Sequence, residues 1–303
     1  MSKPANSFLI CAVSLVAIVM LALAAGCTGT ENTKTATPGT ADTPASAGQR
    51  ETISVSGSTT VLPIVQKAAD SYMAAHTNAD IQVAGGGSGV GIQAIGKKTV
   101  NIGMSSRELK ASEMEASPDL VVTTIAQDGI AIVVNPKNGI ESISLDDVAG
   151  IYLGTITKWS EIAPGAMTGT SDTIVVIGRD SASGTRSYFD EEILKKQTPA
   201  PTMLEKNSNG AVLQTVAQTP GSVGYVSIGF VSDEVKALPI RYSDDKIVAP
   251  SLASVKSREY PISRNLYVIT NGNPKGLTAD FIAYLLCPAG QKIALDEGYV
   301  TVG

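Results

Sequence analysis

The chain contains 303 residues, of which 43% are hydrophobic and 17% charged, and its formal net charge at pH 7 is −5. This length leaves room for about two domains, and the apolar content excludes a disordered chain. The acidic balance offers no basic face for nucleic acid, which argues against that class of partner. It leaves anion binding open, because helix ends and oriented amide groups attract anions locally, whatever the net charge.

The N-terminal segment predicts export. Lys3 precedes an uninterrupted small and apolar run over residues 8–25, and the run leads through Gly26 to Cys27. This pattern is typical of a lipoprotein signal peptide over residues 1–26, with Cys27 as the lipid-bearing first mature residue. The alternative is an uncut transmembrane anchor, because the run is long enough to span a bilayer. Either outcome places the rest of the protein on the outer face of the cytoplasmic membrane, lipid-anchored in the first case.

The composition of the chain changes at residue 51. Residues 27–50 are rich in Thr, Ala and Pro and show no periodicity, which predicts a flexible linker. From residue 51 onwards, short β-branched runs alternate with amphipathic segments. This alternation predicts an α/β fold with mostly parallel sheets.

Four of the predicted strands end in a turn of small polar residues that leads directly into a predicted helix. Such a turn exposes the first amides of the helix, which have no partner inside it and lie at the positive end of its dipole. The first set consists of strand 53–56, turn 57–60 and helix 61–75, and the second of strand 81–84, turn 85–89 and helix 90–95. The third consists of strand 100–104, turn 105–107 and helix 108–116, and the fourth of strand 174–177, turn 178–184 and helix 185–194.

The fourth of these turns carries the strongest chemical signal. The amides of Ser183, Gly184 and Thr185 are predicted to be free donors, and Arg179 brings a planar fork of N–H groups to the same place. A single turn of this kind is equally well explained as a capped helix beside a surface arginine. Four turns that combine hydroxyls, amides and arginine instead predict a tetrahedral anion held between helix ends.

The remaining segments complete the alternation and contain no internal repeat. Strands are predicted at residues 120–125, 130–136, 224–226 and 267–270, helices at 144–152, 209–218 and 278–298, and a short turn or helix at 158–162. Residues 127–129 connect the first two strands. Cys287 falls in the last helix and is predicted to lie in the core.

The residues that enzymes need are scarce. Residues 91–98 approach the P-loop pattern, but Lys98 stands where a hydroxyl would hold Mg²⁺. His76 is the sole histidine of the sequence, so a serine hydrolase or a clustered metal site lacks its residues. Asp180 is the obvious base for a phosphatase, and we interpret it as orienting Arg179 or the neighbouring turn. We therefore predict no catalytic residues, no metal site and no cofactor.

Several segments together resemble the phosphate-binding lipoproteins of the Pst phosphate transporter. They are SGSTTVLPIVQKAADSY (56–72), GGGSGVGIQAI (85–95), NIGMSSRELK (101–110), KWSEI (158–162), IGRDSASGTRSYF (177–189) and PGSVGYV (220–226). Each segment is short, so the order and spacing of the segments are stronger evidence for the resemblance than any single one. The resemblance implies a two-lobed periplasmic-binding-protein fold of the two-strand-hinge type, with the ligand between the lobes. It implies lobe I over residues 51–130, lobe II over 131–260 and a return to lobe I over 261–303.

The resemblance also implies a ligand site, carried over position by position. The implied phosphate-binding residues are Ser58, Thr59, Thr60, Ser88, Ser106, Arg107, Arg179, Ser183, Gly184 and Thr185. Several members of the family have an aspartate at the position of Ser106, where it accepts the proton of the bound phosphate. A serine hydroxyl both accepts and donates, which weakens the argument for rejecting sulfate. Arg107 is either a second charged donor or a surface residue paired with Glu108 or Glu113.

The implied function is that of an extracytoplasmic solute-binding protein and not of an enzyme. The protein is expected to capture inorganic phosphate between its lobes and to deliver it to the permease subunits of an ABC transporter, which recognise the closed form. The alternatives are a binding protein for another tetrahedral oxyanion, such as sulfate, molybdate or tungstate, and a surface lipoprotein without a transport role.

Overall fold

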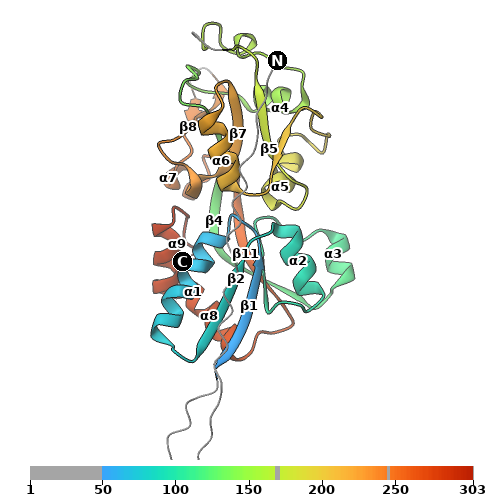
Figure 1. The fold of residues 1–303 in the computed structure, drawn as a ribbon, viewed down its shortest axis with the longest axis vertical. Coiled ribbons are helices and arrows are strands. Elements are labelled where there is room, and N and C mark those ends of the chain that lie inside the picture. Colours follow the sequence, from blue (N-terminus) through green and yellow to red (C-terminus); the bar gives the residue numbers. More distant parts are fainter. Residues whose placement is uncertain (1–49, 168–170, 244–245, 303) are drawn as a thin grey trace, which may run out of the picture. The chain divides into compact units, whose positions relative to one another are not determined.

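A computed structural model describes residues 50–167, 171–243 and 246–302 of the chain (Figure 1). The predicted signal peptide, the lipid-bearing Cys27 and the predicted linker up to residue 49 lie outside these residues. Within the described part, no helix is both long and apolar enough to cross a membrane.

The described residues form one continuous sheet of nine strands in the order β2-β1-β3-β11-β4-β7-β5-β6, and β8 pairs with β4. Pairing is parallel within β2-β1-β3 and β7-β5-β6, and antiparallel where β11 and β4 join these groups. The strands are β1 (Glu51–Gly57), β2 (Ala79–Ala84), β3 (Ile102–Ser105), β4 (Leu120–Val134), β5 (Val175–Arg179), β6 (Leu204–Lys206), β7 (Ser222–Ser227), β8 (Lys236–Leu238) and β11 (Ser263–Asn271). A separate pair consists of β9 (Ile240–Ser243) and β10 (Lys246–Val248).

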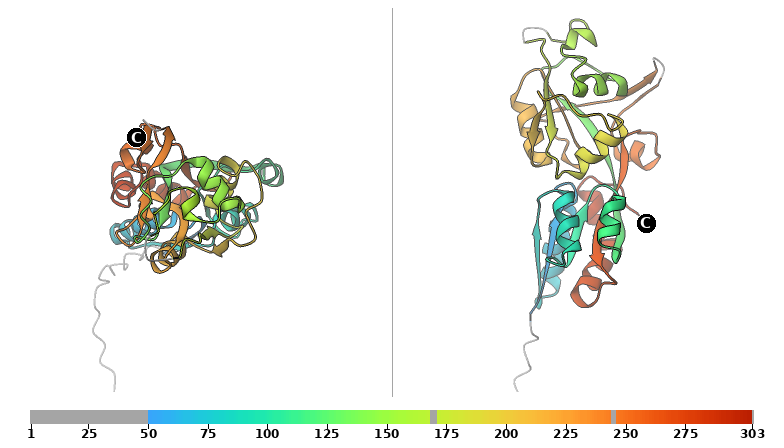
Figure 2. Two further views of the ribbon diagram at one scale, coloured as in Figure 1. Left: turned by 90° about the horizontal axis from the view of Figure 1, so that it is seen from above. Right: turned by 90° about the vertical axis from the view of Figure 1, so that its right-hand side faces the viewer.

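Helices cover both faces of the sheet (Figures 1 and 2). They are α1 (Leu62–Ala75), α2 (Ser88–Gly96), α3 (Ala111–Ala116), α4 (Leu145–Leu153), α5 (Gly184–Glu192), α6 (Asn209–Gln218), α7 (Leu252–Lys256), α8 (Gly276–Leu286) and α9 (Pro288–Asp296), with short 3₁₀ turns η1 (Trp159–Glu161) and η2 (Ile228–Phe230). The helices α1 and α5 start within one residue of the predicted positions, α2 starts two residues earlier than predicted, at Ser88, and α3 starts three residues later.

The chain closes with two helices, and the prediction of one helix over residues 278–298 is wrong. α8 ends at Leu286 and α9 begins at Pro288, with Cys287 in an extended conformation between them. Pro288 cannot donate the hydrogen bond that would continue α8, and its fixed φ suits the first turn of a new helix. Cys287 is consequently half-buried, contrary to the prediction that it lies in the core.

Two long strands connect the halves of the sheet. β4 runs without interruption through residues 127–129, pairing with β11 over residues 120–129 and with β7 over residues 130–134. β11 carries the chain back and pairs with β3 in the first half. Because β4 leaves the first half and β11 returns to it, these two strands form the connection between two lobes.

The buried apolar residues divide into separate clusters along the chain. Residues 53–126 and 266–299 supply one cluster, whereas residues 130–262, with Val300, supply another. Each half of the sheet therefore has a core of its own, as a two-lobed fold requires. The finer boundaries predicted at residues 130 and 260 stay predictions, although the change of cluster falls close to both.

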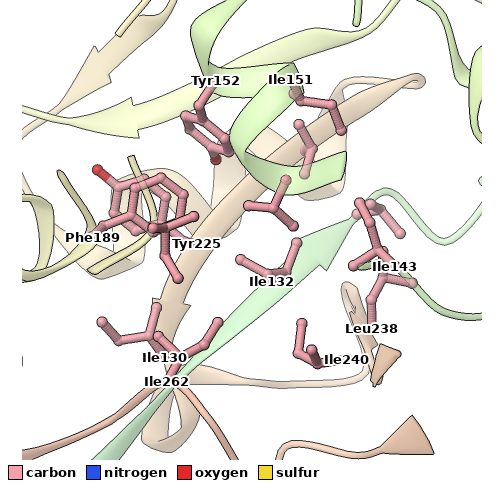
Figure 3. Close-up of a cluster of buried hydrophobic side chains, with 14 of the residues drawn as sticks. Ile130, Ile132, Ile143, Ile151, Tyr152, Phe189, Tyr225, Leu238, Ile240 and Ile262 are labelled. Atoms are coloured by element: carbon pink, nitrogen blue, oxygen red, sulfur yellow. The ribbon is translucent and has the colours of Figure 1, made fainter. Parts of the chain in front are cut away.

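The core of the second half contains a stack of aromatic rings, among them Tyr152, Phe189 and Tyr225 (Figure 3). The buried rings of Phe189 and Tyr225 stack with their centroids 4.2 Å apart, and Tyr152 meets Phe189 edge-on at 4.7 Å. Such ring pairs contribute about 0.5–1.5 kcal/mol beyond the burial of their area. The Tyr225 hydroxyl accepts a hydrogen bond from the backbone N–H of Arg179 at 3.1 Å. The stack thus holds the end of β5, where the Arg179 side chain begins.

Candidate functional site

The four predicted turns meet at the carboxyl ends of β1, β2, β3 and β5. The N–H of Ser58 donates to the carbonyl of Met104 at 3.0 Å, and the N–H of Ser106 donates to Ser88 Oγ at 3.0 Å. These bonds join the turns of the first lobe. The N–H of Gly89 donates to the carbonyl of Ala182 at 3.0 Å, which brings in the turn of the second lobe. The site is therefore built between the two lobes.

Pairs of buried hydroxyls lie between these turns. Thr60 Oγ1 and Thr185 Oγ1, from different lobes, are 3.1 Å apart. Ser88 Oγ and Ser106 Oγ, both from the first lobe, are 3.3 Å apart. A hydroxyl carries one donor and two acceptor positions, so each pair retains hydrogen-bonding capacity for a ligand.

Two other predicted site residues hold their own turns through their side-chain oxygens, and one of them caps a helix. Ser58 Oγ accepts hydrogen bonds from the amides of Thr60 and Val61, at 3.2 and 3.4 Å. Ser183 Oγ accepts from the amide of Arg186 at 3.2 Å and so caps α5. These hydroxyls hold the turns in shape, and a cap of this kind stabilises a helix by about 1 kcal/mol.

Gly184, the first residue of α5, lies where the two lobes approach each other closely. A Cβ atom at this position would overlap Ser88 Oγ and would lie 2.8 Å from Ser106 Oγ. A glycine therefore lets the first amides of α5 come close to the first lobe. Those amides precede the first intrahelical hydrogen bond and carry the positive end of the helix dipole.

Arg179 is a buried cation with no carboxylate partner among the described residues. Its Nε donates to the carbonyl of Lys206 at 3.2 Å, and its Nη2 donates to Thr59 Oγ1 at 3.0 Å and to the carbonyl of Asn207 at 3.3 Å. Its Nη1 has no hydrogen-bond partner within the described part of the chain. The residue is only 1% exposed.

This environment favours an anion beside Arg179. Burial lowers the pKa of the Arg179 guanidinium from 12.5 to about 10. A buried charge without a counter-charge is costly, and a bound anion removes that cost. Asp180 does not supply the counter-charge through a salt bridge, because its Oδ1 accepts the N–H of Ala182 at 3.0 Å and so shapes the turn.

Sequence reasoning missed an ion pair that borders the site. Asp128 of β4 and Arg264 of β11 are direct partners in the strand register. Asp128 Oδ2 accepts from Arg264 Nε at 3.0 Å and from Nη2 at 2.8 Å, and both side chains are buried. Burial raises the pKa of Asp128, while the positive charge of Arg264 acts in the opposite direction. Asn209, also missed, donates from Nδ2 to Thr60 Oγ1 at 3.0 Å.

The structure brings nine of the ten predicted residues together and commits the tenth, Arg107, to an ion pair. The guanidinium of Arg107 donates to both carboxylate oxygens of Glu113, at 2.6 and 2.8 Å, and to the carbonyl of Glu108 at 2.7 Å. This is the alternative arrangement that the sequence left open. The nine residues are Ser58, Thr59, Thr60, Ser88, Ser106, Arg179, Ser183, Gly184 and Thr185.

Glu113→Gln is expected to lower the free energy of unfolding by about 1–2 kcal/mol at neutral pH, because it removes this charge-assisted pair. Burial acts to raise the pKa of Glu113, but the hydrogen bonds and charge of Arg107 outweigh it, so the pKa is lowered overall. A lowered pKa stabilises the fold above the pKa of the unfolded chain, about 4.3, and that stabilisation disappears as the pH falls through the folded pKa.

Thermal melts of wild type and Glu113→Gln across this pH range test the assignment. The difference in melting temperature is expected to be complete above pH 5 and to shrink at lower pH. Glu115→Gln is the matched control, because Glu115 is an exposed residue of the same helix. A difference that stays constant down to acid pH would contradict the ion pair.

A groove of about 1250 Å³ runs alongside the hydroxyl cluster but is lined by other residues. Its walls include Arg107, Tyr188, Arg258 and Arg264. Charges of both signs line it, so it has no clear preference for an anion. Across the described residues, no group of three or more His, Cys, Asp or Glu side chains is placed to hold a metal ion.

Comparison with known proteins places this arrangement in a known class. Residues 42–289 match the family model of the PBP superfamily domain. The phosphate-binding protein PstS of Bacillus subtilis is 34% identical over 252 residues, which span 82% of this chain and 80% of the relative. PstS of Pseudomonas aeruginosa is 28% identical over 274 residues, which span 84% of each chain.

Solved structures agree with these relatives. A Clostridium perfringens substrate-binding protein with bound phosphate superposes with a TM-score of 0.76 and 29% identity, covering 84% of this chain and all of that one. An ABC-type phosphate transport receptor from Vibrio cholerae has a TM-score of 0.67 and 32% identity, covering 82% and 99%. Two lobes that meet over a buried cluster of hydroxyls and an unpaired arginine N–H define a substrate-binding protein. The chain belongs to the PBP superfamily and, within it, to the family of PstS phosphate-binding proteins.

Proposed function

We propose that this protein captures inorganic phosphate between its two lobes and delivers it to the permease of an ABC transporter. The observation that carries the proposal is the buried guanidinium of Arg179, which has an unpaired Nη1 and no salt bridge within the described residues. The printed names of the relatives and the phosphate-bound neighbour support the choice of anion.

The proposed ligand contacts come from both lobes. Thr59, Ser88 and Ser106 act from the first lobe, where Thr60 bonds to the Thr185 hydroxyl behind them, and Arg179 acts from the second together with the start of α5 at Ser183, Gly184 and Thr185. Each charge-assisted hydrogen bond contributes about 1.5–3 kcal/mol net. Several such bonds exceed the cost of closure and of removing water from the anion, so micromolar or tighter affinity is expected. Arg107 is proposed to stabilise the first lobe through Glu113.

Binding is proposed to favour the closed arrangement of the lobes. An anion that bonds to Arg179 on one side and to Ser88 on the other contributes these contacts together only when the lobes are near each other. The ligand therefore shifts an open–closed equilibrium towards the closed form, which the permease recognises.

Another tetrahedral oxyanion is the second candidate, and Ser106 is the observation that favours it. The carboxylate of Asp128 is not a substitute acceptor for a ligand proton, because its oxygens accept from Arg264 and from Ser227 Oγ, the latter at 2.6 Å. The hydroxyls of Ser88 and Ser106 accept or donate with equal ease, so they tolerate an anion without a proton.

Export and anchoring complete the proposal. We propose that the protein lies outside the cytoplasmic membrane, tethered by a lipid on Cys27 and by the linker to residue 50, and that it has no catalytic activity. Cys27 is the proposed lipid site because it follows the small residues at the end of the apolar run.

Thermal melts of the purified full-length chain, titrated with phosphate and with sulfate, test the function. Phosphate at a hundred times its dissociation constant is expected to stabilise the folded state by about 2.7 kcal/mol. Sulfate at the same concentration is expected to stabilise it less. Equal shifts with both anions would identify a general oxyanion binder, and no shift with any anion would favour the surface lipoprotein.

A further inference from the structure

The ion pair on the two connecting strands is held by several hydrogen bonds and points its guanidinium at the site. Asp128 Oδ2 accepts two hydrogen bonds from Arg264, and Asp128 Oδ1 accepts the hydroxyl of Ser227 at 2.6 Å. The Tyr188 ring lies 5.9 Å from Arg264 Cζ, and both residues line the wall of the groove. The orientation of Arg264 is therefore fixed by both connecting strands and by a helix of the second lobe.

The remaining N–H groups of Arg264 bond to both lobes. Nη1 donates to the carbonyl of Ser106 at 3.1 Å. Nη2 donates to Thr185 Oγ1 at 3.0 Å and approaches Thr60 Oγ1 at 3.4 Å. A guanidinium is a fixed fork of donors without any acceptor, so each hydroxyl that it meets must use a lone pair for that contact.

The positions of the hydroxyl protons follow from these donors. Asn209 Oδ1 accepts the N–H of Ser227 at 3.2 Å, which orients the amide so that Nδ2 donates to Thr60 Oγ1 at 3.0 Å. Nη2 has two protons, and Asp128 takes one, so the other is shared between Thr185 and, at 3.4 Å, Thr60. Thr60 thus accepts from Asn209 and from this shared proton, and it donates its own proton to Thr185 Oγ1 at 3.1 Å. Thr185 then accepts from Thr60 and from Arg264, which fills both its lone pairs. The proton of Thr185 is left for the ligand.

We propose that Arg264, held by Asp128, is a positioning residue that makes Thr185 an obligate hydrogen-bond donor to the bound anion. This inference rests on the proposed function, because it takes the bound anion to be phosphate. Thr185 presents its proton before the ligand arrives, so binding requires no reorientation of this hydroxyl. The Ser88–Ser106 pair, which Arg264 contacts only through the Ser106 carbonyl, is left as the place where the proton of the ligand is accepted.

A double-mutant cycle on phosphate affinity tests this role. Arg264→Lys keeps a positive charge for Asp128 but lacks the fork that also reaches Thr185, and it is expected to weaken phosphate binding ~10-fold. Thr185→Val removes the hydroxyl and is expected to weaken binding ~10- to 100-fold. The double variant is expected to bind as weakly as Thr185→Val alone, because Arg264 acts through that hydroxyl.

Calorimetric titration of the full-length chain gives the four affinities, and melts without ligand report folding. Arg258→Lys is the control, since Arg258 is an exposed arginine on the wall of the same groove, and it is expected to leave the affinity unchanged. If Arg264→Lys does not fold, Asp128→Asn/Arg264→Gln removes both charges together and completes the cycle.

The outcomes separate the two proposals. Fold-losses that multiply in the double variant would show that Arg264 acts independently of Thr185 and would overturn the inference while leaving phosphate binding intact. A wild-type chain that binds no phosphate would overturn the proposed function and the inference with it. A double variant within twofold of Thr185→Val supports the inference.

Discussion

Arg179→Met is expected to weaken phosphate binding about 30- to 5000-fold, because truncating one partner of a buried, hydrogen-bonded charge pair costs about 2–5 kcal/mol. The same change is expected to leave the melting temperature of the ligand-free protein unchanged or higher. When the lobes are closed without ligand, the guanidinium is a buried charge with an unpaired Nη1 and a depressed pKa, and an apolar side chain of similar length avoids its desolvation.

A loss of phosphate affinity without a loss of stability distinguishes a ligand-binding arginine from a structural one. Calorimetry measures the affinity, and thermal melts with and without phosphate measure the stability. Arg241→Met is the matched control, because Arg241 is half-exposed and pairs with Asp147 at 3.4 Å. A strongly destabilised Arg179→Met that still binds phosphate would mean that Arg179 serves the fold alone.

Gly184→Ala is expected to weaken phosphate binding about 5- to 150-fold, the equivalent of the 1–3 kcal/mol that overpacking costs. The added methyl group would overlap Ser88 Oγ, which belongs to the opposite lobe. Opening of the lobes relieves this overlap, so the ligand-free protein is expected to melt near the wild-type temperature while the closed, liganded form is penalised.

Gly210→Ala provides a close control for this experiment. Gly210 lies in the first turn of α6 as Gly184 does in that of α5, and a Cβ there meets nothing within 4 Å. We expect Gly210→Ala to retain the wild-type affinity. Small-angle scattering in saturating phosphate is expected to show Gly184→Ala more expanded than wild type. Equal affinity of the two alanine variants would contradict the close approach of the lobes at this site.

Local signals explain why much of the fold could be predicted from the sequence. Runs of β-branched residues followed by Ser, Gly and Thr mark β1, β2 and β5 and the helices that start after them, because caps and turns depend on neighbouring residues. Arg179 could be found for the same reason, since it lies four residues before the Ser183 cap. The pairing of Arg107 with Glu113 was one of two alternatives because the two residues are near in sequence.

Contacts between distant residues account for what could not be predicted. Asp128 and Arg264 are 136 positions apart and meet only because β4 and β11 pair in one register. No spacing in the sequence encodes that register, although an aspartate inside an otherwise apolar strand is a sign of a buried partner. The break at Pro288 was in contrast a local signal that the apolar pattern on either side obscured.

A crystal structure of the phosphate complex would locate the anion. Phosphate is expected within hydrogen-bonding distance of Arg179 Nη1, bonded to the start of α5 at Gly184 and Thr185 and to Ser88 across the lobes. Phosphate bound elsewhere, for example in the groove beside Tyr188, with Nη1 of Arg179 still unpaired, would contradict this expectation.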